Sequence, residues 1–171
     1  NLGAIREDYG LDNFRYGDVM GSATWRYGLS NDMTIGGHGE FTDGLVAAGG
    51  SVQYVLAAGG TLRAGLGVSG GDQGGGARWQ FGYRVQTDDV NYNIDLRGSS
   101  RGFRVAGLEA ALPSNEAFLG VSRNFYGSGY VGMSFVHQGY RQRSDRTIVS
   151  ANYSKGFRNR LTFSARLSYL D

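Results

Sequence analysis

The sequence predicts an all-β protein, an antiparallel transmembrane β-barrel of about twelve strands or about half of a larger barrel. Three observations support this prediction. Apolar and polar residues alternate along runs of roughly ten residues, and short polar turn signals separate the runs. The chain has 30 glycines and 20 Phe and Tyr residues but one proline. A period of two is that of a strand, and alternating segments of about ten residues between turns are typical of outer-membrane barrels.

Composition and charge exclude several classes of protein. The chain carries 17 Lys and Arg against 15 Asp and Glu, without a long basic block, so nucleic-acid binding is not expected. It has no cysteine, which excludes disulfide scaffolds and Cys-based zinc sites. No apolar run approaches the roughly 20 residues of a membrane helix. The first residues lack the features of a signal peptide, so we expect the sequence to begin inside a longer chain or after processing.

Four runs show the alternation most clearly. They cover residues 19–29, 77–85, 90–97 and 161–169. In the third run the apolar side chains would share one face and the polar side chains the other. The apolar members are Val90, Tyr92, Ile94 and Leu96, and the polar members are Asn91, Asn93, Asp95 and Arg97. Each run therefore predicts a strand with one apolar and one polar face.

Weaker alternation predicts the remaining strands. The expected ranges are 33–41, 45–57, 61–69, 103–111, 117–125, 130–138 and 146–155, with residues 1–10 as a further candidate. The phase of the alternation slips around residues 106–112, which predicts a β-bulge. Residues 130–136 are apolar on both faces. The glycine-rich run 70–76 lacks the Gly-Lys-Ser/Thr of a phosphate-binding loop and is expected to be a flexible hairpin loop.

The two faces predict two environments, because the runs are long enough to cross the hydrocarbon layer and longer than the strands of a soluble sandwich. The polar face is expected to line a wet lumen with a positive bias. Its predicted members are Arg26, His38, Glu40, Arg63, Arg78, Gln80, Arg84, Asn91, Asn93, Asp95, Arg97 and Arg166. The apolar face is expected to meet lipid, with aromatic girdles. Its predicted members are Trp25, Tyr27, Tyr54, Trp79, Phe81, Tyr83, Tyr92, Leu96, Phe163 and Tyr169.

Enzymatic and metal chemistry find little support in the sequence. His38 and His137 are the only histidines, and both are expected to be lumen-facing polar residues. His38 and Glu40 would share a strand face, which is too small a set for a metal site. A barrel lipid hydrolase remains open as an alternative, with Ser134 and His137 as the residues to test, although the two have opposite parity. We therefore expect no enzyme activity, no cofactor and no metal.

A family resemblance adds to this interpretation. Residues 25–34 read Trp-Arg-Tyr-Gly-Leu-Ser-Asn-Asp-Met-Thr, and Gly36-Gly37-His38-Gly39-Glu40 follows. This stretch resembles the barrel of fimbrial outer-membrane ushers of the chaperone–usher pathway. Residues 47–56, 61–69 and 81–84 are similar to the same barrel, and residues 97–103 are similar to an usher strand entry. The likeness covers residues 15–105.

The resemblance implies a bacterial outer-membrane protein that passes chaperone-bound pilus subunits through a barrel of about two dozen strands without a cofactor. Residues 1–171 are expected to be one transmembrane unit without the plug, periplasmic and C-terminal domains of an usher. Asp171 is a poor match to the terminal aromatic residue of many autonomous barrels, which favours a segment of an usher. The alternative is a stand-alone, porin-like channel. Open barrel edges would favour self-association.

Overall fold

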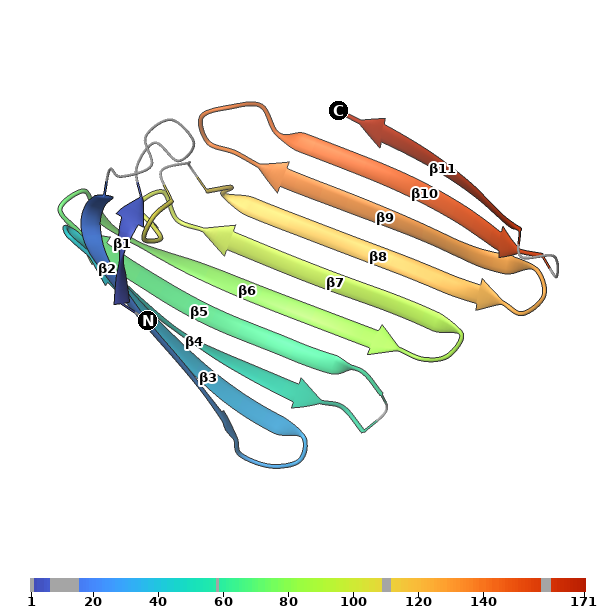
Figure 1. The fold of residues 1–171 in the computed structure, drawn as a ribbon, viewed down its shortest axis with the longest axis horizontal. Helices are drawn as coiled ribbons and strands as arrows, with labels where there is room; N and C mark the ends of the chain where they lie inside the picture. The colour runs from blue at the N-terminus through green and yellow to red at the C-terminus, as the bar shows by residue number, and fades with distance from the viewer. Residues whose placement is uncertain (1, 7–15, 58, 109–111, 158–160) are drawn as a thin grey trace.

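The computed structural model describes residues 2–6, 16–57, 59–108, 112–157 and 161–171, with side chains from Val19 onward (Figure 1). These residues form one antiparallel sheet of eleven strands, each paired with its neighbours in sequence. The strands are β1 Leu2–Arg6, β2 Tyr16–Gly28, β3 Met33–Thr42, β4 Leu45–Val55, β5 Thr61–Gly71, β6 Gly74–Gln86, β7 Val90–Ser99, β8 Asn115–Phe125, β9 Gly129–Gly139, β10 Arg146–Gly156 and β11 Thr162–Leu170. The all-β antiparallel prediction is confirmed. In the described residues, no helix is long and apolar enough to cross a membrane.

The strand expected over residues 103–111 is wrong. Residues 100–108 and 112–114 belong to the connection between β7 and β8, and residues 109–111 lie outside the described residues. Gly107 has a φ of 74°, which a strand residue does not adopt. Pro113 has no backbone N–H to donate to a neighbouring strand. The phase slip therefore marks where the chain leaves the sheet, so the predicted β-bulge is also wrong. Of residues 1–10, residues 2–6 form β1 and residues 1 and 7–10 are not described.

The connections differ in length at the two ends of the sheet. At one end they are residues 43–44, 72–73, 100–114 and 140–145, and at the other they are residues 29–32, 56–60, 87–89, 126–128 and 157–161. Every connection of the second set has three to five residues, whereas the first set combines two two-residue turns with two longer connections, and we call the second end the short-turn end. The glycine-rich run 70–76 is not a flexible loop, because β5 continues to Gly71 and β6 begins at Gly74 after two turn residues. Gly44 (φ 70°) gives a second two-residue turn the left-handed backbone that an Asp-Gly hairpin favours.

The register keeps all strands from β2 to β11 in phase. One row of cross-strand partners is polar or small: Gly36, Ser51, Gly65, Gln80, Arg97, Glu116, Gln138 and Arg146. Another row is apolar: Met33, Tyr54, Leu62, Tyr83, Ile94, Leu119, Phe135, Val149 and Tyr169. Directly opposed residues point to the same side of a sheet. The sheet therefore has one predominantly polar and one predominantly apolar face.

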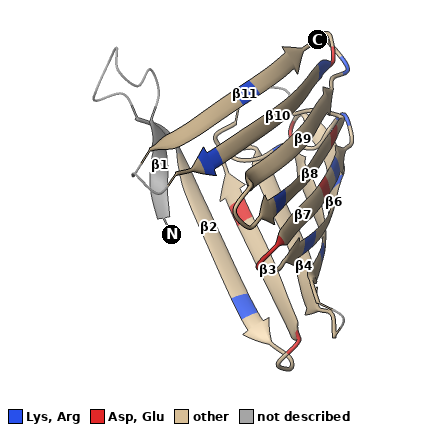
Figure 2. Cartoon of the chain, turned by 90° about the vertical axis from the view of Figure 1, so that its right-hand side faces the viewer, with Lys and Arg blue, Asp and Glu red and all other residues tan. Residues whose placement is uncertain are grey.

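Large side chains on the apolar face are exposed. Leu66 and Leu167 on this face are 73% and 76% exposed. On the polar face, Arg26 and Arg97 are exposed, and Glu40 and Ser69 are buried where residues 104–106 cover them. No large side chain among the described residues is fully buried. Figure 2 shows that the sheet is bent into a trough rather than lying flat. A soluble β-protein buries its apolar face, so this sheet is arranged inside out relative to a soluble fold.

Candidate functional site: the concave polar face

The register brings the predicted lumen residues onto one side of the sheet. A hollow of about 470 Å³ on this side is lined by residues of six adjacent strands, β2 to β7, which shows that the polar face is concave there. The twelve predicted members on this face are Arg26, His38, Glu40, Arg63, Arg78, Gln80, Arg84, Asn91, Asn93, Asp95, Arg97 and Arg166. Whether this face bounds a wet lumen stays a prediction at this point.

The concave face carries more positive than negative charge. Its described strand side chains include seven arginines: Arg26, Arg63, Arg78, Arg84, Arg97, Arg146 and Arg166. They include three carboxylates: Glu40, Asp95 and Glu116. Because a wall with an excess of one charge raises the local concentration of counter-ions, anions would be enriched along it.

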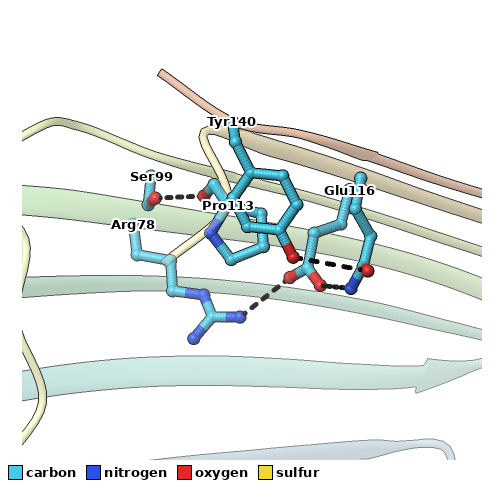
Figure 3. A network of polar contacts seen from close by, with 6 residues as sticks. Arg78, Ser99, Pro113, Glu116 and Tyr140 are labelled. Atoms are coloured by element: carbon cyan, nitrogen blue, oxygen red, sulfur yellow. Dashed lines mark hydrogen bonds and ion pairs between the residues drawn. The ribbon is translucent and has the colours of Figure 1, made fainter. Parts of the chain in front are cut away.

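A polar network joins three strands across this face. Arg78 of β6 donates from Nη2 to Glu116 Oε2 of β8 at 3.3 Å, and Gln138 of β9 donates from Nε2 to Glu116 Oε1 at 3.2 Å (Figure 3). Tyr140 donates its hydroxyl hydrogen to Gln138 Oε1 at 3.4 Å. Both oxygens of the Glu116 carboxylate are thus used. The network cross-links the wall, and it leaves Arg97 beside it as an additional cation.

The connection between β7 and β8 folds back onto the concave face. The Arg104 N–H donates to Ser69 Oγ of β5 at 2.9 Å, and the Ala106 N–H donates to Glu40 Oε1 of β3 at 2.8 Å. A Cβ added at Gly76 of β6 would collide with the backbone of Phe103, so only glycine permits this approach. We call the described residues of this connection, 100–108 and 112–114, the inner segment. It crosses from β7 to β3, and the sequence pattern gave no sign of this path beyond the phase slip.

Glu40 is the central anchor of the inner segment. Its side chain is 8% exposed, and its Oε2 lies 3.1 Å from His38 Nε2 while its Oε1 accepts the Ala106 N–H. His38 Nδ1 lies 3.0 Å from Thr24 Oγ1 on β2. The pair expected from sequence therefore serves a structural contact. Across the described ranges, no three His, Cys, Asp or Glu side chains gather as metal ligands would.

The convex face carries the predicted membrane-facing residues. Eight aromatic side chains on it lie within three residues of the short-turn end: Trp25, Tyr27, Tyr54, Tyr83, Tyr92, Phe125, Tyr153 and Phe163. Trp79, Phe81 and Leu96 lie nearer the strand middles, and Tyr169 lies near the opposite end of β11. The aromatic band is therefore concentrated at one end. Sequence alternation grouped these residues on one face of the sheet, but it could not predict how far along the strands each of them lies.

The alternation is imperfect in the last strands. Phe118, Val136, Ile148 and Leu170 form an apolar row on the concave face of β8 to β11. This row agrees with the sequence observation that residues 130–136 are apolar on both faces. The polar wall is therefore continuous over β2 to β7 and is interrupted by apolar side chains over β8 to β11.

The hydrolase candidates lie on opposite faces. Ser134 pairs with Gly120 and Ser150 on the concave side, whereas His137 pairs with Ala117 and Thr147 on the convex side. A nucleophile and its base must be within hydrogen-bond reach, so these two residues do not form a catalytic pair. The expectation that His137 faces the lumen is wrong. Its Nδ1 lies 3.1 Å from Thr147 Oγ1 on the convex face.

Comparisons with known proteins give a distant likeness to a solved structure. No protein-family description matches the sequence, and no curated protein matches it. A solved structure described as KdgM porin aligns with a TM-score of 0.41 and 10% sequence identity, covering 90% of this chain and 85% of that one. The resemblance to usher barrels finds no support in these comparisons.

Proposed function

We propose that this chain forms the wall of a β-barrel in the bacterial outer membrane and bounds a water-filled passage of the porin-like type. The observation that carries the proposal is the inside-out sheet. Its apolar face is exposed on the convex side, and its charged face lies on the concave side with a hollow above it. An outward apolar band with an inward polar face is the arrangement of outer-membrane barrels. Outer-membrane lipid would cover the convex face.

Strand length supports a transmembrane position. Most strands have 10 to 13 residues. Eleven residues at about 3.3 Å per residue, tilted by about 40°, climb about 28 Å, which spans an apolar band of about 25 Å. The aromatic residues at the short-turn end would lie at one membrane interface, where an amphipathic ring is most stable.

Connection length supports an orientation. Outer-membrane barrels have short periplasmic turns and longer extracellular loops. The two longest connections between described strands at these ends, the inner segment and residues 140–145, lie opposite the short-turn end, at an end that also has the two-residue turns 43–44 and 72–73. The short-turn end would therefore face the periplasm, and the inner segment would narrow the passage from the extracellular side.

The two edges of the sheet need partners in a membrane. Lipid cannot satisfy the backbone groups of an unpaired strand edge. In an antiparallel meander of eleven strands, β1 and β11 run in the same direction. An all-antiparallel ring therefore requires an odd number of further strands between them. Additional strands in an odd number would supply this partner, because a second copy inserted in the same orientation would bring its β1 parallel to β11.

The experiment that tests the proposal combines localisation and solute uptake. The protein should fractionate with outer membranes, and proteoliposomes containing it should take up small sugars faster than empty vesicles. Its band on a gel should shift on heating, as a closed barrel does. Recovery of the folded protein in the soluble fraction, without lipid, would overturn the proposal.

An usher-type assembly platform is the second candidate. The observation that favours it is the open sheet, because eleven strands could form part of a larger ring. In that case chaperone-bound pilus subunits should co-purify with the protein from outer membranes. Solute uptake without any capture of such subunits would remove this candidate. Catalysis is not part of either proposal.

A further inference from the structure

A second hollow lies where three connections meet at the end of the sheet opposite the short-turn end. It has a volume of about 860 Å³, which is within the range of small-molecule sites. Its walls come from the β5–β6 turn, the inner segment and the β9–β10 connection (Figure 1). Four of its lining side chains are arginines: Arg101, Arg104, Arg141 and Arg143. We call this hollow the arginine vestibule.

None of the described residues that line the vestibule is Asp or Glu. Glu116 binds Arg78 and Gln138, whereas Asp145 Oδ1 accepts the Tyr140 N–H at 2.9 Å beside the hollow. Neither Asp145 nor Asp72 of the β5–β6 turn is among the described lining residues. The four guanidinium groups therefore lack carboxylate partners among the described residues that line the hollow.

Two of the arginines are held in place by the protein. Arg141 donates from Nη2 to the Ser99 carbonyl of β7. The guanidinium of Arg143 stacks on the Tyr140 ring, with Cζ 3.6 Å from the ring centroid. Such contacts fix part of a long side chain before a ligand arrives, which lowers the entropic cost of binding. Each guanidinium still has donors free for a ligand, because it carries five N–H groups.

The other two arginines depend on the path of the inner segment. Its backbone is tied to the wall where the Arg104 N–H meets Ser69 Oγ at 2.9 Å and where Phe103 passes over Gly76. Ser69, Gly76 and Ser99 are on the concave face. The vestibule therefore opens on the water side of the wall, above the polar surface, rather than on the convex side that would meet lipid.

From this geometry we propose that the vestibule binds a multiply charged oxyanion carried by a water-soluble solute. Guanidinium groups bind phosphate and carboxylate oxygens through paired, charge-assisted hydrogen bonds, and several arginines around one hollow suit a ligand with several such groups. This proposal depends on the proposed function in one respect only, namely that the ligand reaches the vestibule from the water-filled passage. The ligand would be captured at the mouth before it meets the positive wall below.

Isothermal titration calorimetry of the refolded chain in phospholipid-free micelles tests the site, with tripolyphosphate as the probe. The double variant Arg141→Gln, Arg143→Gln should weaken binding by about tenfold or more, because each lost charge-assisted contact is strong. The matched control is Arg63→Gln, Arg84→Gln, which removes two wall arginines lining a separate hollow. The control should weaken binding by less than about threefold.

Two outcomes would overturn the site. Equal weakening in both double variants would assign binding to the diffuse charge of the wall, and unchanged binding in the vestibule variant would exclude the vestibule. Citrate should compete with tripolyphosphate, whereas maltotriose should not. If phosphatidylglycerol vesicles, and not phosphatidylcholine vesicles, block the probe at the vestibule, the ligand is a lipid headgroup and the soluble-solute proposal fails. None of these readouts requires conduction, so failure of the proposed passage would be seen separately.

Discussion

Replacing Leu66 with arginine would distinguish a membrane sheet from a soluble one by how much it lowers the free energy of unfolding. Leu66 is at the middle of β5 on the convex face, between Gly50 and Trp79, and is 73% exposed. In a bilayer, an arginine at the midplane of an outward face costs about 2–4 kcal/mol. Loss of the lipid-buried leucine adds about 1–2 kcal/mol, since 73% of its surface would meet lipid. Leu66→Arg is therefore expected to lower the free energy of unfolding in a bilayer by about 3–6 kcal/mol in total.

The matched control is Ser51→Arg. Ser51 is exposed on the concave face of β4 and pairs with Gly36 and Gly65, so an arginine there has open space and no charged cross-strand partner. We expect this change to cost less than about 1 kcal/mol, because the new charge stays in water. The same contrast is expected between Leu96→Arg, at about 2–4 kcal/mol, and Asn93→Arg, which should cost much less.

The assay is reversible urea unfolding of the protein in lipid vesicles, followed by tryptophan fluorescence. Both tryptophans, Trp25 and Trp79, lie on the convex face, so their emission reports contact with lipid. If the convex face were in water, Leu66→Arg would change the unfolding free energy by no more than about 0.5 kcal/mol. That result, or an equal cost for Ser51→Arg, would refute the assignment of the two faces.

Three further changes test the inner segment and one turn. Gly76→Ala should displace the inner segment and raise its rate of trypsin cleavage, whereas Gly70→Ala, which has open space around its Cβ, should not. Glu40→Ala should lower the unfolding free energy by about 1–3 kcal/mol, because the buried Ala106 N–H loses its acceptor; an unchanged urea midpoint would contradict this contact. The hydrogen bond from Tyr126 to Asp89, together with the charge of that carboxylate, raises the pKa of the Tyr126 phenol above 10.0. Asp89→Asn should therefore lower this pKa, and an ultraviolet titration that shows the same tyrosine midpoints in both proteins would count against the contact.

The sequence was informative about faces because alternation is a local property. In residues 90–97 each side chain's parity follows from its neighbours, and the register then carries that parity across the sheet. The same reasoning placed Arg84 and Asn93 on one face and Phe81 and Leu96 on the other. Turn signals such as Asp43–Gly44 also located the strand ends.

The path of the inner segment could not be predicted in the same way. Its course depends on two contacts between residues distant in sequence, Ala106 with Glu40 and Arg104 with Ser69. Residues 103–111 contain apolar side chains at roughly strand spacing, so local pattern favoured a strand. The arginine vestibule was missed for the same reason, because Arg101 and Arg141 come together only after the inner segment folds back.

The placement of His137 shows the limit of residue type as a guide. A histidine near a strand end was expected on the polar face, but the register pairs it with Ala117 and Thr147 on the convex face. The alternation along β9 assigns His137 to the convex face, because Val131, Met133 and Phe135 precede it at intervals of two residues on that face. The position of a residue in the alternation along its strand therefore predicted its face of the sheet better than the polarity of its side chain did.

The most direct test of the central claim is single-cysteine labelling in proteoliposomes, which the absence of native cysteine makes clean. Leu66→Cys and Ser51→Cys place one thiol on each face of neighbouring strands. A membrane-impermeant maleimide should label Ser51→Cys rapidly and Leu66→Cys hardly at all, while a lipid-phase quencher should affect only a fluorophore at Leu66→Cys. Equal labelling at both positions by the aqueous reagent would contradict a sheet with lipid on its convex face and water on its concave face.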